Sequence, residues 1–145
     1  MTTTICPTGR ERENLLRKLK EAQHELGYVP QQFMAETARS LGLPIGEIYG
    51  ITTFYSFLST RPLGRYVIRI CKSIPCYLQN ADMIVDTLTN EIGITPGQTT
   101  RDGKFSLQLT NCIGACDMAP AMLVNHDVHG HLTPSKIAEI LKACK

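Results

Sequence analysis

Four of the six cysteines occur as two closely spaced pairs, and each pair directly follows a segment that predicts a β-strand. Cys71 and Cys76 enclose four residues in "CKSIPC", and Cys112 and Cys116 enclose three in "NCIGAC". Thiols at such spacings occur in disulfides, redox dithiols, zinc sites and iron–sulfur clusters. Neither pair by itself distinguishes these chemistries.

The composition narrows the kinds of chemistry that the paired cysteines could perform. The sequence starts without the charged and apolar segments of a secretory signal, and it contains no apolar run long enough to span a membrane. A cytoplasmic protein is therefore expected, in a reducing compartment where stable disulfides are rare. A net charge of +2, from 15 basic and 13 acidic residues, does not indicate a nucleic-acid-binding surface.

Residues 1–63 are predicted to form an N-terminal helical bundle. Thr8 followed by Glu11 fits a capping box at the start of the first helix. Apolar residues then recur at helical spacing, at Leu15, Leu19, Ala22 and Leu26. Prolines favour the starts of the later helices and glycines favour the ends of all of them, at Pro30, Pro44, Gly27, Gly42 and Gly50.

Residues 64–145 are predicted to form a small α/β domain, because short alternating segments now separate the helical ones. The predicted order is strand 65–70, helix 81–92, strand 104–110, a hairpin of 121–125 and 128–132, and a last helix from Thr133-Pro134. A strand, a helix and a second strand in one sheet imply parallel strands.

Parallel strands end at the same edge of a sheet, so both cysteine pairs are expected to lie together as one four-thiolate site. Zinc usually takes tighter C-x2-C pairs, whereas these loops are wider and 35 residues separate them. The spacing favours a [2Fe–2S] cluster over zinc, without excluding zinc. Gly114 would let backbone approach the sulfurs, and the C-x-x-C of a disulfide reductase is missing.

Several other residues allow chemistry but favour simpler interpretations. Cys6 and Cys144 lie outside the paired pattern and are interpreted as free thiols. The three histidines of the predicted hairpin, His126, His129 and His131, are expected on a surface strand. The aromatic segment "GITTFYSF" (50–57) is either an interaction patch or internal packing between the two parts.

Five segments together make the chain closely similar to a known family: "EAQHELGYVP", "EIYGITTFYSFL", "GRYVIRIC", "CIGACDMAP" and "HGHLTP". They resemble the thioredoxin-like [2Fe–2S] subunits, which include the small, cluster-carrying subunit of the NADH dehydrogenases of respiratory complex I. Related small subunits occur in NAD(P)-linked hydrogenases and formate dehydrogenases. The resemblance implies a helical bundle followed by a thioredoxin-like [2Fe–2S] ferredoxin domain.

The resemblance also implies the role of each part. Cys71, Cys76, Cys112 and Cys116 would hold one [2Fe–2S] cluster, and the chain would be a non-catalytic, one-electron-transfer subunit. FMN and NAD(P) would lie on a partner subunit, since no nucleotide-binding loop occurs here. Further iron–sulfur subunits are expected in the same complex, with no nucleic acid, no membrane insertion, and a location at most peripheral to the inner face of the membrane.

One segment departs from the family pattern. Members commonly have a Gly-Thr-Ala-like sequence and a following His around the first cysteine pair, whereas this chain has Lys72–Pro75 and then Tyr77. The hydrogen bonds around the cluster are therefore expected to differ. A structural zinc adaptor of a complex is the alternative function, and a free-standing disulfide reductase is a third.

Overall fold

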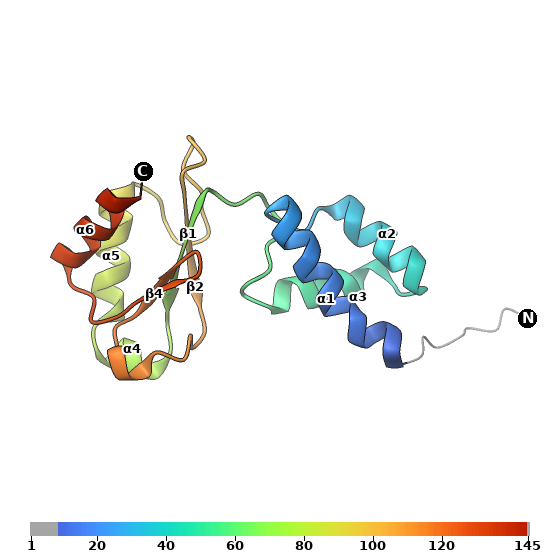
Figure 1. Ribbon diagram of the computed structural model, residues 1–145, viewed down its shortest axis with the longest axis horizontal. Helices are drawn as coiled ribbons and strands as arrows, with labels where there is room; N and C mark the ends of the chain where they lie inside the picture. The colour runs from blue at the N-terminus through green and yellow to red at the C-terminus, as the bar shows by residue number, and fades with distance from the viewer. Residues whose placement is uncertain (1–8, 145) are drawn as a thin grey trace, which may run out of the picture. The chain divides into compact units, whose positions relative to one another are not determined.

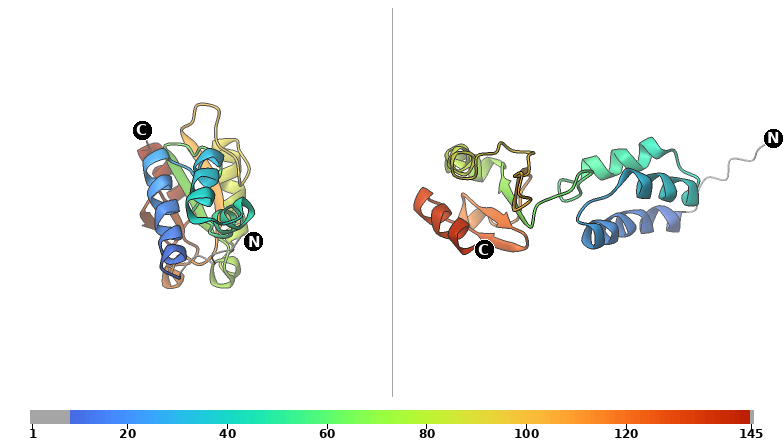
Figure 2. Two further views of the ribbon diagram at one scale, coloured as in Figure 1. Left: turned by 90° about the vertical axis from the view of Figure 1, so that its right-hand side faces the viewer. Right: turned by 90° about the horizontal axis from the view of Figure 1, so that it is seen from above.

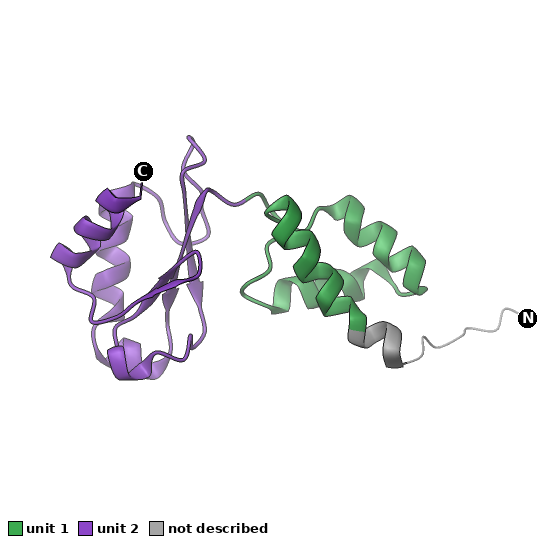
Figure 3. Cartoon of the chain, in the orientation of Figure 1, with its two compact units in different colours: residues 1–62 green, residues 63–145 purple. Residues whose placement is uncertain are grey.

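The computed structural model describes the backbone of residues 9–144 and the side chains of residues 14–144. The chain divides into two compact units, Met1–Pro62 and Leu63–Lys145, which Figure 3 colours separately. We call them the helical unit and the sheet unit. The predicted capping box, whose side chains are those of Thr8 and Glu11, lies outside the described side chains, and so does Cys6.

The described residues of the helical unit form three helices, as its proline and glycine pattern predicts (Figure 1). They are α1 (Gly9–Leu26), α2 (Gln31–Leu41) and α3 (Ile45–Phe54). Pro30 and Pro44 occupy the positions just before α2 and α3, in extended backbone conformation. Gly42 ends α2 in the left-handed region, at φ 62°, where glycine is least strained. Buried apolar side chains fill the space between the helices: Leu15, Leu19, Val29, Met34, Ala38, Leu43 and Ile48.

Two details of the helical unit differ from the sequence-based expectation. α3 continues past Gly50 to Phe54, because a glycine within a helix weakens it by only about 1 kcal/mol relative to alanine. The hydroxyl of Thr52 donates to the carbonyl of Ile48 at 2.8 Å within this extension. The buried stripe of α1 ends at Ala22, and Leu26 in the last turn is 53% exposed.

The sheet unit has the predicted element order with two short additions. Its elements are β1 (Tyr66–Cys71), α4 (Ile74–Leu78), α5 (Ala81–Ile92), β2 (Phe105–Thr110), η1 (Cys116–Met118), β3 (Met122–Val124), β4 (Asp127–His129) and α6 (Pro134–Ala143). The four strands form one sheet in the order β2-β1-β3-β4. β1 and β2 are parallel, as predicted, and the other neighbours are antiparallel.

The core of the sheet unit lies between the sheet and the two longer helices. α5 and α6 cover the same face of the sheet, as the two views of Figure 2 show. Alternate side chains of β1 point to that face, so Ile68 and Ile70 are buried against Ile84 and Leu88 of α5 and Ile137 of α6. No described helix is long and apolar enough to cross a membrane.

The two short helices were not predicted, because five or fewer residues show no helical periodicity. The predicted hairpin is present, but β4 already begins at Asp127, which pairs with Val124. The turn is therefore only Asn125 and His126.

Asn125 fastens this turn to the start of β1. Its side-chain oxygen accepts from the Val67 amide at 2.9 Å, and its side-chain amide donates to the Arg65 carbonyl at 3.3 Å. Its backbone adopts φ 56°, a left-handed conformation that asparagine tolerates better than most residues.

We expect Asn125→Ala to lower the free energy of unfolding by about 2–3 kcal/mol, through two lost hydrogen bonds and the strained backbone. Asn125→Gly loses the same bonds without the strain, so it should be about 1 kcal/mol less destabilising. Urea unfolding of both variants measures the difference. Equal losses in the two variants would contradict a contribution from the backbone conformation.

Candidate metal centre

The parallel pairing of β1 and β2 brings both cysteine loops to one edge of the sheet. Cys71 is the last residue of β1 and lies opposite Thr110, the last residue of β2. Cys112 follows two residues later, and α4 and η1 carry Cys76 and Cys116 at the same end of the sheet (Figure 1). The prediction that the two loops emerge together is confirmed.

The four sulfurs interact with one another across the loops. The Cys112 and Cys116 sulfurs are 3.4 Å apart, and the Cys71 and Cys76 thiols are hydrogen-bonded. The two pairs also interact electrostatically with each other. Cys116 lies close enough to Cys76 to affect its pKa, and Cys71 lies close enough to Cys112 to do the same. All four are free thiols in the structure. Among the described residues, no group of three or more His, Cys, Asp or Glu side chains has the arrangement of a site for a single ion.

Burial divides the thiols into an inner and an outer pair. Cys71 and Cys76 are each 1% exposed, whereas Cys112 and Cys116 are exposed. The inner pair packs against Ala81, Ala115 and Ala121. These small side chains allow the backbone of both loops to come close to the sulfurs.

Backbone N–H groups point at the sulfurs from both loops. Gly114 donates to the Cys112 sulfur at 3.4 Å, and its φ of 81° is a conformation that favours glycine. The amides of Ser73 and Ile113 both donate to Cys71, so this sulfur has one donor from each loop. The amide of Ala121 donates to Cys76. Such donors stabilise negative charge on sulfur, as any thiolate site requires.

These contacts separate the pKa values of the thiols within each pair. The Gly114 amide and then the Cys116 thiol hold the pKa of Cys112 below its usual range. The hydrogen bond between these two thiols has the opposite effect on Cys116 and raises its pKa. Burial raises the pKa of Cys76. Burial acts in the same direction on Cys71, but hydrogen bonds led by that of the Ser73 side chain outweigh it and leave its pKa lowered.

The segment between β4 and α6 holds the second cysteine loop in place. The His131 amide donates to the Met118 carbonyl at 2.7 Å, and the Leu132 amide donates to the Pro120 carbonyl at 3.1 Å. Gly130 packs so tightly there that an added Cβ would lie 2.3 Å from the Met118 Cβ. No sequence pattern indicates this role for Gly130, although it lies in the family-like segment "HGHLTP".

The remaining candidate residues lie apart from the sulfurs or outside the described part. Cys144 belongs to the core under the sheet, where burial raises its pKa. Of the hairpin histidines, His126 is exposed and His129 is half-buried at the end of β4. His131 is exposed and lies beyond the strand, and His126 lies in the turn, so the surface-strand prediction is wrong for both of these residues.

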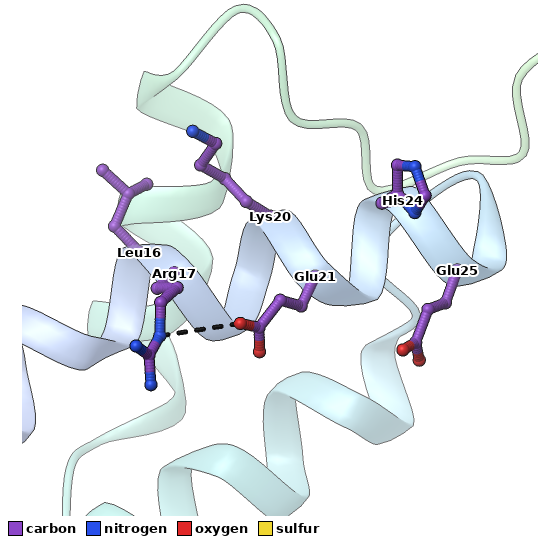
Figure 4. Close-up of a pocket in the computed structure, with 6 residues that line it drawn as sticks. All are labelled: Leu16, Arg17, Lys20, Glu21, His24 and Glu25. Atoms are coloured by element: carbon purple, nitrogen blue, oxygen red, sulfur yellow. Dashed lines mark ion pairs between the residues drawn. The ribbon is translucent and has the colours of Figure 1, made fainter.

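The helical unit has surface hollows that contain no thiol. A hollow of about 570 Å³ runs along α1, where Arg17 and Glu21 form an ion pair at 3.5 Å (Figure 4). A second, of about 440 Å³, is lined by Met34, Ile45 and Tyr49 among others. The aromatic segment 50–57 is largely exposed, with Phe54 at 79%.

Comparison with known proteins assigns the chain to a family. The model of the family described as thioredoxin-like [2Fe–2S] ferredoxin matches residues 1–145. The chain belongs to this family. The resemblance found in the sequence is thereby confirmed, as are the fold and the single [2Fe–2S] cluster that the family is named for.

Individual relatives of this [2Fe–2S] family are subunits of larger enzymes. The NADH-quinone oxidoreductase subunit named E of Escherichia coli (strain K12) is 41% identical over 90% of this chain and 78% of its own length. NADP-reducing hydrogenase subunit HndA of Solidesulfovibrio fructosivorans is 33% identical, over 88% of this chain and 75% of its own. A crystal structure of an NAD+-reducing [NiFe]-hydrogenase matches with a TM-score of 0.74 and 29% identity, covering 90% of this chain and 22% of that one.

Gly130 provides a test of how the second cysteine loop is positioned. We expect Gly130→Ala to displace Met118 and with it the neighbouring Cys116, so the purified protein should keep less than half of its iron and acid-labile sulfide. Gly50→Ala is the matched control, since nothing lies within 4 Å of the added Cβ and the helix should gain stability. Wild-type iron and sulfide content in Gly130→Ala would contradict this role.

Proposed function

We propose that Cys71, Cys76, Cys112 and Cys116 hold the [2Fe–2S] cluster and that the chain is a one-electron-transfer subunit of an NAD(P)H-oxidising complex. The observation that carries the proposal is the meeting of four interacting thiols at one sheet edge, with backbone donors from both loops. Four cysteine thiolates are the usual ligands of such a cluster.

The grouping of the thiols fits two irons better than one zinc ion. The Cys112–Cys116 and Cys71–Cys76 pairs are each in contact, and each pair would take one iron. A tetrahedral zinc site instead needs four sulfurs around a single point. Cys71 and Cys112 already have lowered pKa values, so one thiol of each pair is disposed to become a thiolate.

When bound, the cluster exchanges one electron at a time, at about −400 mV for all-cysteine clusters of the plant type. This chain supplies the amides of Ile113, Gly114 and Ala121, which stabilise the additional negative charge of the reduced state. Lys72 acts in the same direction, whereas Asp117 opposes it; both side chains are exposed.

A partner subunit must carry the flavin and the nicotinamide nucleotide. NAD(P)H gives up two electrons as hydride, and a flavin converts this into single-electron steps. The sequence has no G-x-G-x-x-G loop to bind either. We place this partner against the outer cysteine pair and the exposed apolar side chains of α4, which are Ile74, Tyr77 and Leu78.

The relatives named above suggest two settings, a quinone-reducing NADH dehydrogenase and an NAD(P)-linked hydrogenase. In either setting we propose further iron–sulfur subunits beyond the flavin-bearing partner. We also propose a cytoplasmic location, peripheral to the inner face of the membrane through the complex. Affinity purification from the native organism should recover a flavoprotein with the chain; recovery of the chain alone would contradict this part.

The ligand assignment is tested with matched cysteine variants. We expect wild-type protein to hold two irons and two acid-labile sulfides per chain and to give an EPR signal after one-electron reduction. Cys112→Ser should lose most of the iron and most of the sulfide, because it removes the thiolate of an exposed cysteine of the site. Cys144→Ser should keep wild-type content, since Cys144 lies in the core under the sheet.

The outcomes separate the cluster from its rivals. Colourless protein with zinc but neither iron nor sulfide would replace the electron-transfer function by that of a zinc adaptor. Full cluster content in Cys112→Ser would overturn the assignment of Cys112 as a cluster ligand. Disulfide reduction by the isolated chain would support the reductase instead.

A further inference from the structure

Ser73 lies between the two cysteine loops, with its hydroxyl against a sulfur of each. The Cys71 thiol donates to the Ser73 Oγ at 3.4 Å. The Ser73 side chain also forms a hydrogen bond with Cys112, on the other loop.

From this position we propose that the Ser73 hydroxyl donates a hydrogen bond to a cysteine sulfur of the bound cluster and raises its reduction potential. The inference rests on the proposed function. It concerns Ser73 as a positioning and tuning residue, because the hydroxyl contacts ligand sulfurs and takes no part in any bond change.

The ordinary role of a serine at this position is to cap a helix, and Ser73 does not perform it. Ser73 occupies the N-cap position of α4, where a serine side chain usually accepts a hydrogen bond from the first turn. No such bond is present, and the hydroxyl contacts the sulfurs instead. The helix therefore forgoes a stabilising cap while the site gains a donor.

The direction of the effect follows from which atom carries the proton. A thiolate has no proton to donate, so with Cys71 and Cys112 ionised the Ser73 hydroxyl becomes the donor. A hydrogen bond to a charged acceptor strengthens as the acceptor becomes more negative. One added electron makes the sulfurs more negative, so the hydroxyl stabilises the reduced state more than the oxidised one.

Ser73 can be removed as a donor, whereas the surrounding amides cannot. Its own amide donates to Cys71 and stays in place when the side chain is replaced. Ser73→Ala therefore deletes one hydrogen bond from an otherwise constant set. Ser73→Thr keeps the hydroxyl and adds only a methyl group to a half-buried side chain.

The test is an EPR-monitored redox titration of the full chain with dithionite as electron donor, and it reports only molecules that hold a cluster. At a fixed solution potential we expect the ratio of reduced to oxidised cluster in Ser73→Ala to be about tenfold below wild type, the factor expected for one charge-assisted hydrogen bond. For a one-electron couple this equals a midpoint about 59 mV lower.

Two variants serve as controls. Ser73→Thr should titrate within about twofold of wild type, because its hydroxyl replaces the missing donor. Ser40→Ala removes a hydroxyl that donates to the Thr37 carbonyl within α2, and should leave the titration unchanged. The amide protons on the sulfurs should couple to the reduced cluster in all variants, and one further exchangeable proton should be present in wild type and Ser73→Thr and missing in Ser73→Ala.

The following results would contradict the role proposed for Ser73 or the function on which it rests. An unchanged midpoint in Ser73→Ala, with cluster bound, overturns the tuning role. Complete loss of the cluster in Ser73→Ala, with Ser73→Thr intact, would make the hydroxyl an assembly requirement and likewise overturn it. If wild-type protein binds neither iron nor sulfide, the proposed function fails first, and the two failures are thereby distinguished.

Discussion

The candidate site depends on one constraint, the parallel pairing of β1 with β2. Their register places Cys71 opposite Thr110, so both strands end at the same level and both loops start from there. Parallel neighbours require a crossover, which α5 supplies on the face that it shares with α6 (Figure 2). The hydrophobic core under the sheet therefore fixes where two cysteine pairs, separated by 35 residues of sequence, come together.

The sequence predicts the regular elements well, because they are set by local patterns. The helical stripe of α5 follows from one face meeting the core, and the apolar, β-branched run of β1 fits a central strand that is buried on both faces. The parallel order then implies that the loops meet, and the structure confirms it. The assignment of the four cysteines as ligands stays a prediction, since spacing allows several metals.

Features of the fold that have no repeating sequence pattern could not be predicted from the sequence. α4 has only five residues, so nothing in "CKSIPC" distinguishes a short helix from a loop. The contact of Gly130 with Met118 joins positions that no periodicity relates. Ser73 precedes a helix that the sequence does not predict, and only the structure shows its hydroxyl at the sulfurs. Tertiary contacts of this kind are decided by the whole fold rather than by neighbours in sequence.

Some departures from local preference lie beside the cysteine loops, whereas Asn125 lies at the other end of β1. Of the described residues other than glycine, three have left-handed backbone: Asn80, Asn125 and His131. Asn80 directly follows the first loop and its helix, and the His131 amide holds Met118 of the second. Asparagine tolerates this conformation, whereas histidine does so at a cost that its hydrogen bond offsets. Local strain persists only where surrounding structure determines it, and it concentrates at functional positions. The uncapped helix at Ser73 is a further departure beside the sulfurs, because the Ser73 hydroxyl contacts Cys71 rather than the first turn of its own helix.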